Sequence, residues 1–250
     1  MNKKTKALSL NLLATLALYL LIVVLMASGV LSNYLANIII TICITIIMTA
    51  SLNVTTGLLG QLALGHAGFM AIGAYVSALF TKSVTLDFGL SLPLSLLIGG
   101  AVAALFGMLI GIPALRLQGD YLAIITLGFG EIIRVLITTV FAPWTGGGRK
   151  MMGIPLYTTI NFSYFTMVLA VSLLFMLAWS RHGRAILAIR ENEIAADASG
   201  VPVTRYKILT FSISAFFAGV AGALYAHSVG VLDPAKFDFN KSIEYLVMVV

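Results

Sequence analysis

The stretch RHGRAILAIRENEIAADASGVPVTRYK, residues 181–207, is the longest charged segment of a chain that is otherwise strongly apolar. It holds eight ionised side chains, and an apolar run long enough to cross a bilayer lies on either side of it. Because charged side chains resist hydrocarbon, we expect this segment to lie in water between two membrane-spanning helices. Five of its charges are positive, which places that water on the cytoplasmic side.

The same stretch carries the signals of a short helix. Asn192 can cap a helix start, and Glu193 suits the positive end of the helix dipole. Three alanines follow at 195, 196 and 198, Gly200 can end the helix in a left-handed conformation, and Pro202 prevents its continuation. We predict a helix of about two turns here. Two interpretations remain open from the residues: a helix that docks into another protein's groove, or a solvated connector that is helical.

Composition places the whole chain in a membrane. Sixty per cent of the 250 residues are hydrophobic, ten per cent are charged, and no charge occurs between Ala7 and Thr81. This predicts an all-α fold, a polytopic transmembrane helical bundle of seven to eight segments. The net charge of +6 is explained by the excess of basic residues in cytoplasmic loops, so it does not indicate nucleic acid. The single cysteine, Cys43, lies in an apolar run and is interpreted as a packed thiol.

The apolar runs predict seven crossings with a cytoplasmic N-terminus. The predicted spans are residues 7–30, 34–56, 60–80, 92–115, 121–141, 162–180 and 208–229. The inner segments between them hold nine basic residues against five in the outer segments, including an outer loop at 233–241. The glycine-rich run at 60–80 is either a short span or a partly re-entrant segment. An eighth apolar run from Ser242 is shorter than a span, so we expect the chain, a single domain, to be truncated at its C-terminus.

Two ionisable side chains lie within the predicted fifth span. Glu131 and Arg134 are three residues apart, so they can meet on one face of a helix. A charge at this depth must be paired or must face a water-filled cavity. The pair is either the polar wall of a transport path or a structural ion pair that joins helices.

An irregular patch follows the second span. Gln61 and His66 lie among several glycines, including Gly65, where the backbone can leave the helical conformation. Such backbone is stable at membrane depth only when it is buried in protein or lines a cavity, and its free amides and carbonyls can hold an amino-acid-like ligand. The alternative is close helix packing, with His66 a hydrogen-bonded core residue.

Motifs of enzymes are missing from the sequence. It contains no GxxxxGK[ST] nucleotide loop, no HExxH or GxSxG motif, and no Cys/His cluster with metal spacing. We therefore predict a protein that is not an enzyme, with no catalytic residue, no cofactor and no metal.

Four stretches resemble a known family, the LivM-type permease subunits of bacterial ABC importers for branched-chain amino acids. They are SLNVTTGLLGQLALGHAGFMAIGAYVSALF (51–80), GIPALRLQGDYLAIITLGFGEIIRVL (111–136), TGGGRKMMGIP (145–155) and the long stretch at 181–227. The resemblance implies a multi-pass protein of the bacterial inner membrane. It also implies a second permease subunit, two cytoplasmic ATPase subunits and an extracytoplasmic substrate-binding protein as partners.

In this family a cytoplasmic loop of the EAA type contacts the ATPase. Ala195, Ala196 and Gly200 match its spacing, whereas Ile194 replaces its acidic residue and Glu193 stands one position earlier. The resemblance therefore favours the docking helix within a coupling loop at 181–207. The predicted coupling residues are Arg190, Asn192, Glu193, Ala195, Ala196, Asp197, Gly200 and Val201. The predicted lining of the translocation path is Gln61, Gly65, His66, Glu131 and Arg134.

Three alternatives to this function remain. Permeases of urea and short-amide importers are similar, so the substrate is less certain than the class. A secondary transporter could work without ATP, with Glu131 and His66 relaying protons or binding ions. A membrane scaffold would transport nothing.

Overall fold

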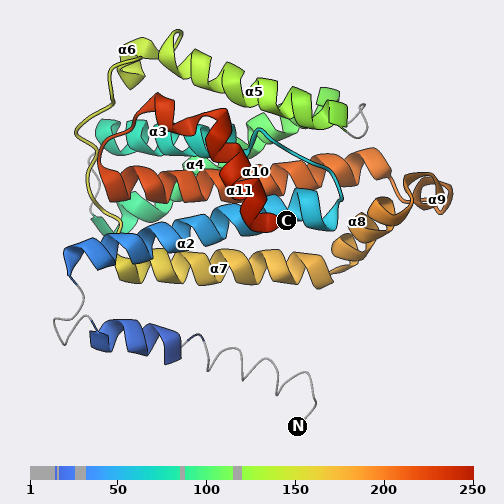
Figure 1. Ribbon diagram of the computed structural model, residues 1–250, viewed down its shortest axis with the longest axis horizontal. Helices are drawn as coiled ribbons and strands as arrows, with labels where there is room; N and C mark the ends of the chain where they lie inside the picture. Colours follow the sequence, from blue (N-terminus) through green and yellow to red (C-terminus); the bar gives the residue numbers. More distant parts are fainter. Residues whose placement is uncertain (1–14, 16, 26–31, 85–87, 115–119) are drawn as a thin grey trace.

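The computed structural model describes residues 15, 17–25, 32–84, 88–114 and 120–250 (Figure 1). Most of the predicted first span, 7–30, therefore lies outside the described residues, although 17–25 are helical. The rest of the described chain forms helices joined by short connections. They are α2 (Asn33–Asn53), the π-helix η1 (Val54–Leu58), α3 (His66–Ser83), α4 (Phe88–Ala114), α5 (Asp120–Thr138), α6 (Ala142–Thr145), α7 (Ile160–Trp179), α8 (Arg181–Glu191), α9 (Glu193–Ala198), α10 (Val203–Val229), the 3-10 helix η2 (Pro234–Phe237) and α11 (Phe239–Val249).

The prediction of a polytopic helical bundle is confirmed. Five helical segments of the described chain are long and apolar enough to cross a membrane: Asn33–Leu58, Gly89–Ile112, Tyr121–Thr138, Ile160–Trp179 and Val203–Val229. They correspond to the predicted spans at 34–56, 92–115, 121–141, 162–180 and 208–229. The last begins five residues earlier than predicted, because the helix already includes the charged residues Arg205 and Lys207.

The predicted segment at 60–80 is only partly helical. The π-helix η1 ends α2, an extended stretch follows to Gly65, and α3 begins at His66 with its first ten residues buried in the bundle. The amides freed by this break find partners on other helices: the Leu64 amide donates to Thr126 Oγ1 at 3.0 Å, and the Ala67 amide donates to Ser242 Oγ at 3.1 Å. An extended approach therefore precedes a buried helix, because these hydroxyls replace the missing helical hydrogen bonds.

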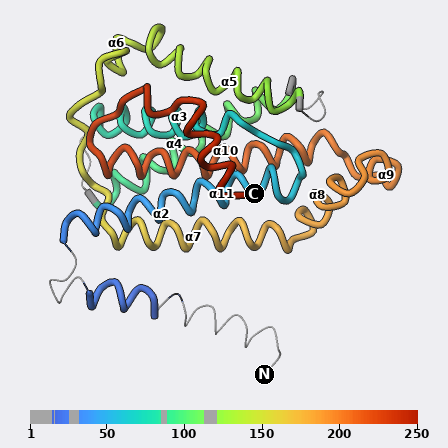
Figure 2. The backbone as a smooth tube through the Cα atoms, in the orientation of Figure 1, coloured from blue at the N-terminus to red at the C-terminus, as the bar shows by residue number. Residues whose placement is uncertain are grey.

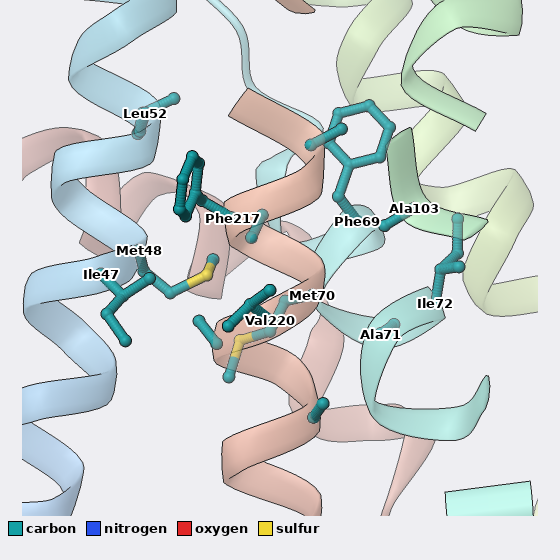
Figure 3. Packing of buried hydrophobic residues seen from close by; sticks show 14 of the residues in the cluster. Ile47, Met48, Leu52, Phe69, Met70, Ala71, Ile72, Ala103, Phe217 and Val220 are labelled. Atoms are coloured by element: carbon teal, nitrogen blue, oxygen red, sulfur yellow. The ribbon is translucent and has the colours of Figure 1, made fainter. Parts of the chain in front are cut away.

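The core is built around α10, which packs against α2, α3 and α4. Figure 3 shows apolar side chains of α2 and α3 gathered beside Phe217 and Val220 of α10. Helices α3 and α10 approach so closely that a Cβ at Gly73 would collide with the backbone of Gly219. Small residues at the contact let the two backbones meet, which is how helices pack when lipid offers no hydrophobic contrast.

Two parts of the chain lie outside this central packing. Helix α5 runs along one side of the bundle, and α8 and α9 project from one end (Figures 1 and 2). The predicted outer loop at 233–241 is wrong in part. Residues 234–237 form η2, and α11 begins at Phe239 after Asp238, whose carboxylate accepts the Lys241 amide and caps the helix.

Candidate functional site

The charged stretch contains two helices, one more than predicted. The first, α8, is capped by Ser180, whose hydroxyl accepts the Gly183 amide at 3.1 Å. Its buried residues Gly183, Ile186 and Ile189 recur every three positions along one face. That spacing is the signal that could have predicted α8 from the sequence.

The second helix, α9, is the predicted one. Asn192 caps it, with Oδ1 accepting the Ala195 amide at 3.0 Å, and the helix ends at Ala198. Gly200 follows with φ at 84°, the left-handed conformation expected after a helix end. Ala196 is buried beneath the helix, so α9 rests on the bundle by one face and leaves the other in solvent.

A buried ion pair fixes α9 to α10. Lys207 is 2% exposed, and its ammonium lies 2.7 Å from both carboxylate oxygens of Glu193. A lysine so buried needs a carboxylate nearby, because desolvation otherwise disfavours its charge. Glu193 thus contacts the α10 side chain as well as lying at the positive end of the α9 dipole.

The other predicted coupling residues differ in exposure. Arg190, Asn192, Ala195, Asp197 and Gly200 are exposed, whereas Val201 is half-buried. Sequence reasoning left Ile194 out of the predicted set, yet its side chain is 83% exposed at the end of the bundle. A large apolar side chain in this position forms a projecting knob on the solvent face of α9.

Arg190 links this unit to the broken segment after α2. Its Nη1 donates to the carbonyl of Gly57, in η1, at 2.5 Å. Its aliphatic stem lies against Gly60, where φ is 73° and a Cβ would come within 2.8 Å of Arg190 Cγ. The end of α8 therefore contacts η1 itself, at Gly57, and the chain just after it, at Gly60.

His66 lies at the other end of that extended stretch, in a buried polar cluster. It is 1% exposed, and its Nε2 is 2.8 Å from Ser51 Oγ of α2. The Ser51 carbonyl in turn accepts the hydroxyl of Ser214 on α10 at 2.7 Å. The structure thus places His66 among packed helices with a hydrogen-bond partner. This is the arrangement expected if His66 is a hydrogen-bonded core residue.

The remaining predicted path residues are dispersed. Gly65 packs against the backbone of Thr126 and Gly130 on α5. Gln61 is half-buried, and within the described residues its Oε1 has no hydrogen-bond partner.

The Glu131–Arg134 pair forms as the spacing predicted. Arg134 Nε donates to Glu131 Oε2 at 2.8 Å, and each side chain is about one-third exposed. Both residues lie on α5, so the pair does not join two helices of the described chain. Nor do the described residues contain a group of three His, Cys, Asp or Glu side chains that could hold a metal ion.

Residues 34–250, which include the helices from η1 to α11 and all of α2 but its first residue, match the family model for the permease component of the branched-chain amino acid transport system. The chain belongs to this permease family. The solved structures include no match.

Curated relatives agree with this assignment. The permease is 40% identical to the high-affinity branched-chain amino acid transport system permease protein LivM of Salmonella typhimurium, and equally to that of Escherichia coli, over 80% of this chain and 54% of each relative. It is 30% identical to the guanosine ABC transporter permease protein NupQ of Bacillus subtilis, over 69% of this chain and 60% of that relative. The permease thus spans about half the length of the LivM proteins it matches.

Proposed function

We propose that this chain is the membrane-spanning permease subunit of an ABC importer that carries branched-chain amino acids across a bacterial inner membrane. The family match and the 40% identity to two LivM proteins support the substrate class. The N-terminus lies in the cytoplasm, as does the end of the bundle that carries α8 and α9. A second permease, two ATPases and an extracytoplasmic binding protein complete the transporter.

The observation that carries the proposal is the construction of α9. The helix presents Ile194 to solvent, while the burial of Ala196 and the Glu193–Lys207 ion pair fix its inner face. A short helix that is rigidly held and has an apolar knob is suited to a groove on another protein. The occupant in this proposal is the ATPase subunit, because a relative 30% identical to this chain is a permease protein of an ABC transporter.

Two contacts carry movement of the ATPases into the membrane. The ion pair between Glu193 and Lys207 transfers displacement of α9 to α10, the central helix. The hydrogen bond from Arg190 to Gly57 transfers displacement of α8 to η1 and to the extended stretch that leads to His66. Alternating access requires rigid elements of this kind between the energy source and the substrate path.

Copurification in mild detergent tests the proposal. An ATPase subunit should accompany the wild-type permease and be lost with Ile194→Asp, which puts a charge into an apolar contact. Met152→Asp is the matched control, because Met152 is 65% exposed and lies in the loop at the other end of the bundle. Absence of an ATPase with wild type would contradict the importer, and retention with Ile194→Asp would contradict α9 as its contact.

A further inference from the structure

A charged hollow lies beside the start of α11, on the face that Figure 1 shows in front. Its volume is about 400 Å³. The hollow is bounded by α3, α10, η2 and α11. Its lining residues are Met70, Tyr225, Lys236, Phe237, Asp238, Asn240, Lys241 and Glu244.

The hollow extends from near the end of the bundle opposite α8 and α9, where Tyr225 lies four residues before the end of α10, towards the middle of the bundle. Met70, on its floor, is 12 residues before Lys82 in α3, which is about 18 Å along a helix. Lys82 donates to the carbonyl of Met152 in the loop at that end of the bundle. Tyr245 of α11 reaches the same depth, because its hydroxyl is 3.4 Å from Met70 Sδ.

The charged side chains that line the hollow are exposed rather than enclosed. The side chains of Lys241 and Glu244 are 39% and 54% exposed, and Lys236 is exposed as well. Such charges cannot face hydrocarbon without a large penalty, so this face of α11 borders water or another subunit. A groove along α2 and Met248 continues the same face, and its polar members recur every four residues: Asn37, Thr41, Thr45 and Thr49.

Two polar groups of the hollow remain open to a ligand within the described residues: the Lys236 ammonium and one oxygen of the Glu244 carboxylate. Asp238 is occupied, because one oxygen accepts the Lys241 amide and the other accepts the Asn240 side chain. Glu244 binds Lys241 through Oε2 at 2.6 Å, which leaves its other oxygen open. Within the described residues, no hydrogen bond or ion pair holds the Lys236 ammonium.

We propose that this hollow is a substrate subsite of the translocation path, formed for a zwitterionic amino acid with an apolar side chain. The inference rests on the proposed function. The carboxylate of the amino acid faces Lys236, its ammonium faces the open oxygen of Glu244, and its side chain lies on Phe237 and Met70. Both of these apolar residues are buried, so they form a fixed floor.

The test uses the assembled transporter without its binding protein, so that a docked protein cannot shield the hollow. Asn240→Cys provides a reporter, since the chain's only cysteine, Cys43, is buried. A charged methanethiosulfonate should label it, whereas Phe165→Cys, at an apolar position within the candidate span α7, should stay unlabelled. Leucine at about ten times its half-saturating concentration should slow labelling about tenfold by mass action.

Two analogues of leucine test the two charges. Leucinamide lacks the carboxylate, and 4-methylpentanoate lacks the ammonium. Each should protect about tenfold less well than leucine or worse, because a contact between charged groups is lost. With Lys236→Gln, leucinamide should protect as well as leucine, and with Glu244→Gln the acid should protect as well as leucine.

The outcomes separate this subsite from the proposed function. If Asn240→Cys is not labelled, a subunit interface covers the hollow and the subsite is wrong. The subsite is equally wrong if leucine does not slow labelling of Asn240→Cys. It is also wrong if, with Lys236 and Glu244 unchanged, leucine and both analogues slow this labelling equally. In each of these cases an ATPase that still copurifies leaves the importer intact, and only its absence from wild type contradicts the importer itself.

Discussion

Removing the charge of Glu193 should break the ion pair that holds α9 against α10. The variant Glu193→Gln leaves the Lys207 ammonium buried at 2% exposure with no carboxylate beside it. Breaking a buried pair in this way costs about 3–5 kcal/mol, and we expect about 3 because 39% of the Glu193 side chain is exposed to water. For a chain of this size that lowers the melting temperature by about 6–12 °C.

Cys43 supplies the assay. It is 4% exposed in the folded chain, so a thiol-reactive fluorophore reports unfolding as the sulfur becomes accessible during heating. Glu191→Gln is the matched control, because Glu191 is exposed two residues away and makes no ion pair within the described residues. It should shift melting by less than about 2 °C.

The double variant Glu193→Gln with Lys207→Met separates a lost ion pair from a disturbed helix. Methionine removes the buried charge and keeps most of the volume, so the double variant should return to within about 1 kcal/mol of wild type. Melting of Glu193→Gln within about 2 °C of wild type would refute the reasoning. So would a double variant less stable than Glu193→Gln alone.

Three further results are expected. Gly73→Ala forces α3 from α10 and should destabilise the bundle by about 1–3 kcal/mol, whereas Gly89→Ala, with open space at its Cβ, should leave melting nearly unchanged. Asn192→Ala removes the α9 cap and should speed hydrogen exchange of its first-turn amides about fivefold, for a loss of about 1 kcal/mol, with Asn192→Asp restoring protection. The Ala235 amide and Lys150 hold the pKa of Asp233 below its usual value, so the Asp233 carboxylate stabilises the fold at any pH above the usual pKa. This stabilisation is lost as the pH falls through the lowered pKa. The difference in melting temperature between wild type and Asp233→Asn should therefore be constant near neutral pH and vanish in acid.

The apolar runs were sufficient to predict five spans and the nature of the fold. Spanning helices satisfy their own backbone hydrogen bonds, so length and hydropathy alone identify them. The signals that predicted α9 were equally local, because Asn192 and Gly200 act on residues within a few positions of themselves. Helix α8 could have been found from the spacing of Gly183, Ile186 and Ile189, whereas the burial of His66 against Ser51 could not.

By itself the sequence determined the class of protein, the principal spans, the capped helix and the spacing that pairs Glu131 with Arg134. Only the tertiary structure decided the partners of Arg190 and Lys207 and the depth of the charges on α11. The physical reason lies in the bilayer. Faces that meet lipid and faces that meet other helices are both apolar, so hydropathy marks a span without saying what it packs against. Contacts such as Arg190 to Gly57 join residues 133 positions apart, and they form only when the packed helices bring both ends together.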